Sequence, residues 1–398
     1  MNCRASIGIQ ILDDEPFMRM LLGHMLATLD FTEVSCFQSG LAALSAFDSP
    51  GGIPELILLD LDMPEMDGVE FVRHLADRTY PGSLILVSGE DSRMLQAVEK
   101  LALSYNLSVL GSLPKPPSLE GLSALLQEWP YEVAKTPRAA PKTYTADELR
   151  NAITNGELIN YYQPKVAVAN REVIGVESLV RWQHPTDGLV FPDQFIPLAE
   201  AQGLIGHLTQ VVLKMALDQA GIWQDAGLAL CVAVNVSMDD LAELEFVDFV
   251  TAATAAAGVV PQNLVLEVTE SRLMQQLTPV LEVLTRLRLK RFRLSIDDFG
   301  TGHSSLVQLR DLPFDELKID RSFTHGAGQD ARLRALFTNS LNLAHELGMA
   351  VVAEGVEDAS DWAFLRSCGC QFAQGYFIGR PMPADSLPNW LADWQSGV

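Results

Sequence analysis

Carboxylate side chains follow apolar runs at several points of this chain of 398 residues. Asp13 and Asp14 follow the run 7–12, and Asp60 lies at the end of the run 56–61. If these runs are parallel strands, their carboxyl ends share one edge of a sheet and the three acids meet in one crevice. Neighbouring carboxylates repel one another unless a divalent cation lies among them, and oxygen ligands suit Mg²⁺. The alternative is that these acids only cap turns and helices.

A second series of polar residues follows apolar runs later in the chain, namely Glu177, Asn235, Glu267 with Glu270, Asp297 with Asp298, Lys318, Glu354 and Gln374. At the rim of a barrel these side chains would share one bowl, as active-site residues of barrels do. So many carboxylates favour two divalent ions bound by oxygen. Asp297 could bridge both ions while Asp298 reaches only the second, and such a pair can activate water against a phosphodiester. Lys318 would orient that water or neutralise charge.

A single acid at a strand end is often only a helix cap or a solvated carboxylate. Here the polar residues recur at seven strand ends, and they include the rare Asp297-Asp298 pair before Phe-Gly-Thr-Gly. The recurrence favours a site over coincidence.

Two sets of alternating elements must position these residues. Residues 1–129 have apolar runs at 7–12, 56–61, 84–87 and 107–110 and helical patterns that include 16–29 and 69–76. This alternation predicts a doubly wound, flavodoxin-like α/β domain. Residues 146–398 continue the alternation over a length typical of a (β/α)₈, TIM-like barrel. Residues 130–145 contain prolines at 130, 137 and 141 and predict a linker, after which Thr145 and Glu148 have the form of a capping box.

The charge balance is strongly acidic, with 51 Asp and Glu against 28 Lys and Arg and a formal charge of −23. This argues against binding to a nucleic acid polymer or an anionic membrane, because both require a positive field. The five cysteines are odd in number and irregularly spaced, which fits reduced thiols in the cytoplasm. We find no signal peptide pattern and no apolar stretch of about 18 residues, so we expect a cytoplasmic protein without membrane insertion.

The run LLDLDMPEMDG at 58–68, together with Asp13-Asp14, Ser88 and Lys115-Pro116, resembles the response-regulator receiver family over roughly residues 5–128. The resemblance implies that Asp60 accepts a phosphoryl group from a sensor histidine kinase or phosphotransfer protein. It also implies that Asp13, Asp14 and Asp60 hold one Mg²⁺. Ser88 and Lys115 would contact the phosphoryl oxygens, with Lys115 neutralising the added anion.

The motifs ESLVRW at 177–182, DDFGTGHSSL at 297–306, LKID at 317–320 and VAEGVE at 352–357 resemble the EAL family of cyclic di-GMP phosphodiesterases, over essentially residues 146–395. The resemblance implies two Mg²⁺ or Mn²⁺ ions, the first bound by Glu177, Asn235, Glu267 and Asp297 and the second by Asp297 and Asp298. It places Glu354 beside the metals as a ligand or base, and Lys318 beside the attacking water. Glu270 would brace the loop after Asp298. The residues along the dinucleotide would be Gln163, Leu179, Arg181 and Gln374.

Three positions depart from the two families. Ser112 stands where receivers often carry a switch aromatic, Ser178 replaces the usual alanine of the EAL motif, and His303 replaces a common tyrosine. Strand alternation directs Ser178 away from Glu177 towards the helical layer, so this replacement predicts little loss.

These patterns predict a response regulator that hydrolyses cyclic di-GMP to pGpG, with turnover modulated by phosphorylation of Asp60. The alternative is a catalytically weak receptor that binds the dinucleotide and acts through a protein partner. The complete set of metal ligands favours the enzyme. The chain has no GGDEF signature of a diguanylate cyclase, so degradation alone is expected, and a homo-oligomer is the expected assembly.

Overall fold

A computed structural model describes residues 7–47, 52–89, 92–105, 107–129, 142–269, 277–300 and 306–396. The chain forms two compact units, Met1–Lys142 and Thr143–Val398. Most of the predicted linker, 130–145, lies outside the described residues, so its bounds stay a prediction.

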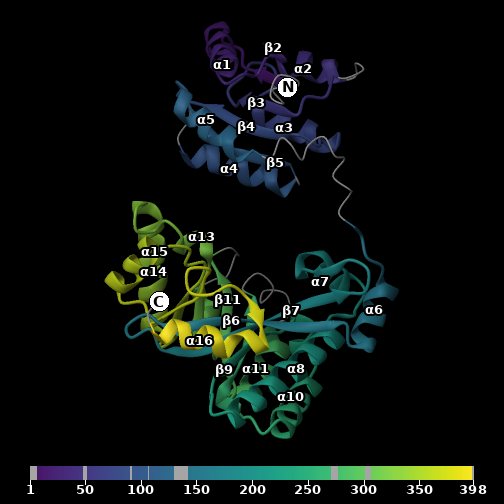
Figure 1. The fold of residues 1–398 in the computed structure, drawn as a ribbon, viewed down its shortest axis with the longest axis vertical. Helices are drawn as coiled ribbons and strands as arrows, with labels where there is room; N and C mark the ends of the chain where they lie inside the picture. Colours follow the sequence, from purple (N-terminus) through teal and green to yellow (C-terminus); the bar gives the residue numbers. More distant parts are fainter. Residues whose placement is uncertain are drawn as a thin grey trace. The chain divides into compact units, whose positions relative to one another are not determined.

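The first unit is a five-stranded parallel sheet with strand order β2-β1-β3-β4-β5 (Figure 1). This is the flavodoxin-like order of a doubly wound fold, as predicted. Its elements are β1 (Ile9–Leu12), α1 (Pro16–Thr28), β2 (Val34–Phe37), α2 (Gly40–Phe47), β3 (Leu56–Asp60), α3 (Gly68–Asp77), β4 (Ser83–Ser88), α4 (Ser92–Ser104), β5 (Ser108–Pro114) and α5 (Leu119–Glu128).

The central strands of this sheet are buried on both faces. Every residue of β3 and β4 is buried, which explains their continuous apolar runs. Successive residues of β3 point to opposite faces, so Ile57 belongs to one hydrophobic cluster and Leu58 to the other. The two cores fix the sheet and bring the carboxyl ends of β1 and β3 to one edge.

The second unit is a barrel surrounded by helices (Figure 1). Its first half contains α6 (Ala146–Asn155), β6 (Leu158–Ala167), β7 (Val173–His184), β8 (Gly188–Val190), α7 (Pro192–Ala201), α8 (Ile205–Asp225), β9 (Cys231–Asn235), α9 (Met238–Ala242), α10 (Glu245–Ala256) and β10 (Leu264–Thr269). Its second half contains α11 (Leu277–Leu289), β11 (Arg293–Phe299), α12 (Leu306–Asp311), β12 (Glu316–Ile319), α13 (Arg321–Thr324), α14 (Ala331–Glu346), β13 (Ala350–Ala353), α15 (Ala359–Cys368), β14 (Phe372–Ala373), β15 (Met382–Pro383) and α16 (Leu387–Ser396).

The barrel closes through β6, which pairs with β7 on one side and with β14 on the other. Both pairings are antiparallel, whereas β7, β9, β10, β11, β12, β13 and β14 follow one another in parallel. The predicted α/β barrel is therefore confirmed, with one strand running against the others. The capping box is also confirmed, because the Thr145 and Glu148 side chains each accept from the other's backbone amide at the start of α6.

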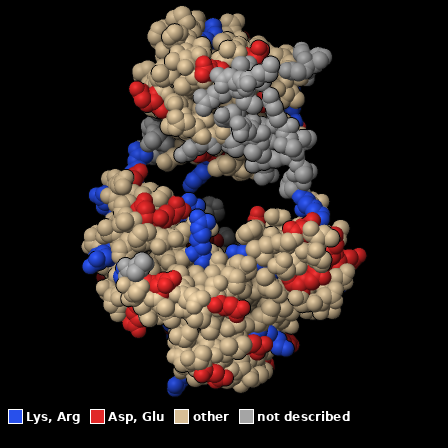
Figure 2. Space-filling model, viewed as in Figure 1, with Lys and Arg blue, Asp and Glu red and all other residues tan. Residues whose placement is uncertain are grey.

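Two further expectations concern the whole chain. Among the described residues, no helix combines the length and hydropathy needed to cross a membrane. The described cysteines, Cys36, Cys231, Cys368 and Cys370, are free thiols. On the face shown in Figure 2, acidic side chains are spread over the surface with basic ones interspersed among them.

Candidate active site

The strands of the barrel bring most of the second polar series together. Glu177 lies in β7, Asn235 ends β9, Glu267 lies in β10, Asp297 and Asp298 lie in β11, and Lys318 lies in β12. Glu354 and Gln374 directly follow β13 and β14. These side chains project from different strands into one site, as in other barrels.

Lys318 is the centre of this site. Its ammonium lies 2.8 Å from Glu354 Oε1, 2.9 Å from Asp297 Oδ1, 3.0 Å from Glu267 Oε2 and 3.3 Å from Glu177 Oε2. The Lys318 side chain is only 1% exposed. Burial by itself lowers the pKa of Lys318, but the surrounding carboxylates, Asp297 first, raise it well above its usual value. Lys318 is therefore held as a cation.

Amide side chains complete the surroundings of Glu177. Asn235 Nδ2 donates to Glu177 Oε1 at 2.9 Å, and Gln374 Nε2 donates to Glu177 Oε2 at 2.7 Å. Gln374 Nε2 also donates to Gln163 Oε1 at 3.0 Å. Burial opposes ionisation of Glu177, but Lys318 and these amides outweigh it and lower the pKa of Glu177. The network fixes Glu177 as a carboxylate with a defined orientation.

Three other acids of the site, Glu354, Asp298 and Glu267, are held closer to neutrality. Burial raises the pKa of Glu354 to about 8, against the attraction of Lys318. Burial, followed by the charge of Asp297, raises the pKa of Asp298 to about 6. Burial also raises the pKa of Glu267 well above its usual value. Additional positive charge beside these three groups would favour their ionised forms.

The donor set fits two divalent cations. Glu177, Glu267 and Asp297 offer oxygens within 4.8 Å of one another, as do Asp297, Asp298 and Glu354. Asp297 belongs to both groups, the position that a bridging ligand would need. Glu267 Oε1 is buried and accepts no hydrogen bond from the described residues, so one lone-pair direction is open for a cation. When ionised, the five carboxylates and Lys318 leave four negative charges, which two divalent ions would balance.

A cavity of about 230 Å³ adjoins these acids. Its lining includes five predicted residues, namely Gln163, Glu177, Leu179, Glu354 and Gln374. It also includes residues that sequence reasoning did not assign, namely Arg321, Gly355, Glu357, Gly375 and Tyr376. We refer to it as the site cavity. The signal for Glu357 was present, because it closes the motif VAEGVE three residues after Glu354.

A second cavity of about 250 Å³ shares Leu179 with the site cavity, and we refer to it as the flanking cavity. It also contains Asn235, Pro192, Ile196 and residues of α8. Ser178 lines it beside these α8 residues, which confirms that Ser178 faces the helical layer.

One residue predicted to lie along the dinucleotide, Arg181, is not among the described residues that line the two cavities. Its guanidinium lies 5.1 Å from the centre of the Phe191 ring and donates to the Val180 carbonyl. Glu270 lies outside the described residues, as do Thr301, Gly302 and His303. Their predicted roles stay predictions.

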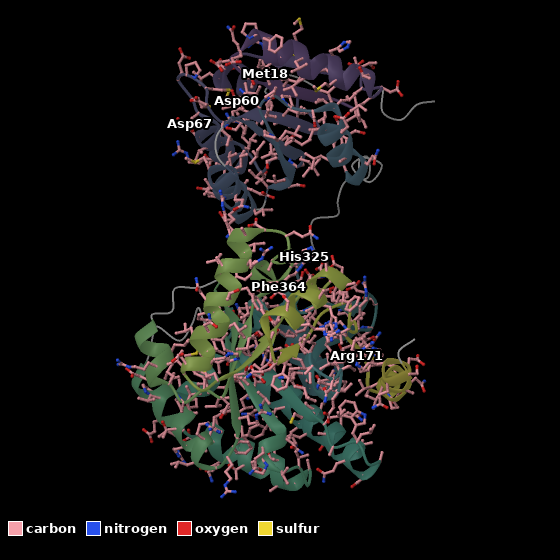
Figure 3. All side chains as sticks on the ribbon, turned by 90° about the vertical axis from the view of Figure 1, so that its left-hand side faces the viewer. Met18, Asp60, Asp67, Arg171, His325 and Phe364 are labelled. Atoms are coloured by element: carbon pink, nitrogen blue, oxygen red, sulfur yellow. The ribbon has the colours of Figure 1, made fainter. Side chains whose placement is uncertain are left out.

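The first unit places its predicted residues at or directly after the carboxyl ends of β1, β3, β4 and β5, which form one edge of the parallel sheet, and Figure 3 labels Asp60 among these residues. Asp13, Asp14 and Asp60 offer oxygens within 4.8 Å of one another. Lys115 Nζ lies 2.7 Å from Asp60 Oδ2 and 3.0 Å from Asp13 Oδ2. Burial raises the pKa of Asp60, whereas the hydrogen bond that Asp60 accepts from Lys115 lowers it; the net shift is upward. The Lys115 amide donates to the carbonyl of Ser88, which brings the ends of β4 and β5 together at this edge.

Comparison with known proteins agrees with this geometry. The family model described as EAL domain matches residues 146–381, and that described as response regulator receiver domain matches residues 9–137. The chain is 33% identical over 380 residues to the cyclic di-GMP phosphodiesterase RocR of Pseudomonas aeruginosa, covering 95% of this chain and 96% of RocR.

Other relatives share the barrel alone. The bifunctional diguanylate cyclase/cyclic di-GMP phosphodiesterase MucR of Pseudomonas aeruginosa is 41% identical over 258 residues, which are 65% of this chain and 38% of MucR. A solved structure of the PaMucR phosphodiesterase in complex with c-di-GMP matches with a TM-score of 0.58 and 43% identity, over 61% of this chain and 98% of that one. The chain therefore belongs to the EAL domain family, and it carries a response regulator receiver domain ahead of its EAL barrel.

Proposed function

We propose that this protein is a response regulator that hydrolyses cyclic di-GMP to linear pGpG at two divalent metal ions, Mg²⁺ or Mn²⁺, bound in the barrel. The observation that carries the proposal is the pair of carboxylate groups that share Asp297 around the buried ammonium of Lys318. The likeness to RocR, which spans both domains, supports the same substrate. The five residues predicted to bind metal lie together in the site, which supports an enzyme rather than a receptor.

The two cavities suit an extended ligand with a base at each end. Leu179 lines both the site cavity and the flanking cavity, so a cyclic dinucleotide could lie across it with one base in each. In the site cavity, the Glu357 carboxylate can accept from the two parallel N–H donors of a guanine edge, and Tyr376 offers a ring for stacking. Glu357 and Tyr376 would then recognise guanine, while the phosphodiester lies beside Glu177.

The chemistry divides among these residues. The bound ions would activate a water and stabilise the leaving oxygen. Lys318 keeps a positive charge beside the reacting phosphate and orients the water by hydrogen bonding. Glu354, only 2.8 Å from Lys318, is placed to take the proton of the water. Asn235 and Gln374 keep both oxygens of Glu177 in place during the reaction.

The receiver would supply regulation. Asp60 would accept a phosphoryl group from a sensor histidine kinase or phosphotransfer protein, with one Mg²⁺ held by Asp13, Asp14 and Asp60. Lys115 already contacts Asp60 and would neutralise part of the added charge. We further propose a cytoplasmic homo-oligomer in which receiver phosphorylation changes the turnover rate.

The test is chromatography of cyclic di-GMP incubated with the purified full-length chain and Mg²⁺ or Mn²⁺. The expected product is pGpG, and a chelator should abolish its formation. Asp297→Asn should lower turnover by more than about 100-fold, because even outer-shell partners of metals change activity by about 10–100-fold. Asp147→Asn, an exposed acid on α6, is the matched control and should behave as wild type. Tight binding without turnover would instead indicate a receptor.

A further inference from the structure

The loop between β13 and α15 holds the Glu357 carboxylate between two basic side chains. Arg321 Nη2 lies 2.6 Å from Glu357 Oε1, and His325 Nε2 lies 3.8 Å from Glu357 Oε2. Arg321 carries a permanent charge, whereas the charge of His325 depends on pH. Glu357 lines the site cavity, so the charge on His325 acts on a side chain that faces the ligand.

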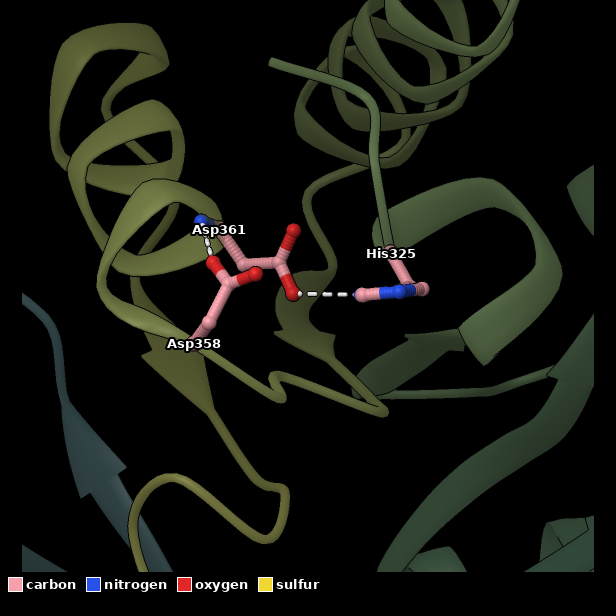
Figure 4. A group of neighbouring side chains, drawn as sticks. All are labelled: His325, Asp358 and Asp361. Atoms are coloured by element: carbon pink, nitrogen blue, oxygen red, sulfur yellow. Dashed lines mark hydrogen bonds and ion pairs between the residues drawn. The ribbon is translucent and has the colours of Figure 1, made fainter. Parts of the chain in front are cut away.

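Asp361 fixes the position of His325 (Figure 4). Asp361 is 1% exposed, and its Oδ2 lies 2.9 Å from His325 Nδ1. The same carboxylate accepts from the backbone amides of Gly326 and Glu357, both at 3.0 Å. Asp361 therefore ties the turn after α13 to the loop that carries Glu357, and it holds the imidazole beside Glu357.

The contact with Asp361 also determines the tautomer of neutral His325, and therefore whether Nε2 faces Glu357 as a donor or as an acceptor. A carboxylate accepts only, so Nδ1 must carry a hydrogen, and the neutral imidazole then presents the Nε2 lone pair towards Glu357. Two acceptors repel each other at this distance. When His325 is protonated, Nε2 becomes a charged donor and attracts the Glu357 carboxylate. The two states of His325 thus have opposite effects on Glu357.

Among the described residues, the charged groups around His325 are three acids and one arginine. Asp361 and Asp358 face it from the start of α15, Glu357 faces it from the preceding loop, and Arg321 of α13 pairs with Glu357. The hydrogen bond to Asp361 raises the pKa of His325, which is partly exposed. Protonation of His325, as pH falls through this raised pKa, therefore produces the attractive state.

We propose that His325 is a positioning residue for Glu357, and that its protonation orients the Glu357 carboxylate for the base of the dinucleotide. The inference rests on the proposed function because it takes cyclic di-GMP as the ligand. Because the pKa of His325 is raised, the attractive state is complete at low pH and is lost as pH rises through that value. Binding should therefore weaken towards alkaline pH, by about 2- to 5-fold for a partly exposed ion pair.

The test measures the Kd of cyclic di-GMP for the full-length chain in EDTA, so that no hydrolysis intervenes, from pH 6 to pH 9. Other groups, such as Glu354 and Asp298, titrate in all variants, so the readout is the ratio of each variant's Kd to that of wild type. His325→Gln should bind about 2- to 5-fold more weakly at pH 6 and equally at pH 9. His325→Lys, a permanent cation, should keep tight binding at both pH values.

Two further variants separate positioning from folding. In Asp361→Asn, the weakening of binding with rising pH should occur at lower pH than in wild type, because the substitution removes the charge that favours the imidazolium. His345→Gln, an exposed histidine on α14, should match wild type throughout. A constant ratio for His325→Gln across the pH range overturns the inference, even if turnover to pGpG supports the proposed function. Failure to bind cyclic di-GMP at any pH overturns both.

Discussion

Replacing Lys318 with methionine should destabilise the barrel strongly, and divalent metal should restore much of the loss. Lys318 contacts four carboxylates and is 1% exposed, so Lys318→Met leaves a cluster of buried acids without their cation. Breaking a buried ion pair by removing one partner costs about 3–5 kcal/mol. For a unit of this size, each kcal/mol corresponds to a shift in Tm of roughly 2–4 °C. The expected decrease in Tm is therefore roughly 6–20 °C in EDTA.

The assay is calorimetric unfolding of wild type and variant, in EDTA and in excess Mn²⁺. Two ions bound by the freed carboxylates would stabilise the folded barrel, so the difference in Tm should shrink when Mn²⁺ is added. Lys165→Met is the matched control, because Lys165 is a buried lysine 2.8 Å from Glu316, a carboxylate outside the proposed metal groups. Its loss of stability should be the same in both buffers. If Mn²⁺ raised the Tm of the two variants by the same amount, the carboxylates around Lys318 would not be the metal site.

Three other predictions concern metal affinity, regulation and the receiver fold. The pKa values of Asp298 and Glu354 are raised to about 6 and about 8. If both carboxylates bind metal as proposed, they must first release the protons that they hold at acidic pH. Calorimetric titration should therefore show weaker Mn²⁺ binding at pH 6 than at pH 8, and a pH-independent affinity would contradict their role. Treatment with an acyl phosphate should change the turnover rate of wild type but not of Asp60→Asn; equal rates in treated and untreated wild type would remove the proposed coupling. Asp67 accepts from the Glu70 amide at 2.7 Å as the N-cap of α3, so Asp67→Ala should lower the free energy of unfolding of the receiver by about 1 kcal/mol in urea titrations, and an unchanged midpoint would show that the cap contributes nothing.

Local sequence pattern was sufficient for most of the fold. The strands β3 and β4 are short apolar runs because both their faces are covered, and the acids Asp60 and Asp297 lie at or near the ends of such strands. The strand β2 was not among the predicted runs. Its sequence VSCF lies at the edge of the sheet with every residue at least partly exposed, so it lacks a continuous apolar signal.

The direction of β6 could not be read from pattern. A strand buried in a barrel has the same apolar character whether it runs with or against its neighbours. Its antiparallel pairing depends on the short turn between Ala167 and Val173, and on β14 reaching the other side of β6. The pairing of β6 with β7 places Gln163 opposite Glu177. The pattern of polar residues at strand ends did not predict this neighbour of Glu177.

The positions of side chains relative to one another were the least predictable part of the site. The identity of the carboxylates followed from strand ends, but the central position of Lys318 depends on the register of four strands. The pairing of His325 with Asp361 joins residues 36 apart, one directly after α13 and the other in the first turn of α15, and neither residue belongs to a quoted motif. Such contacts depend on how helices dock, which local periodicity does not encode.

The most direct test of the central claim is to count metal ions and measure hydrolysis in the same samples. An Asp14→Ala variant removes a proposed ligand of the receiver Mg²⁺, so that Mn²⁺ added to the metal-free chain should report on the barrel. The two-metal account predicts that two ions bind per barrel and that pGpG formation follows occupancy of the second. Full turnover with a single ion bound, or in EDTA, would contradict it.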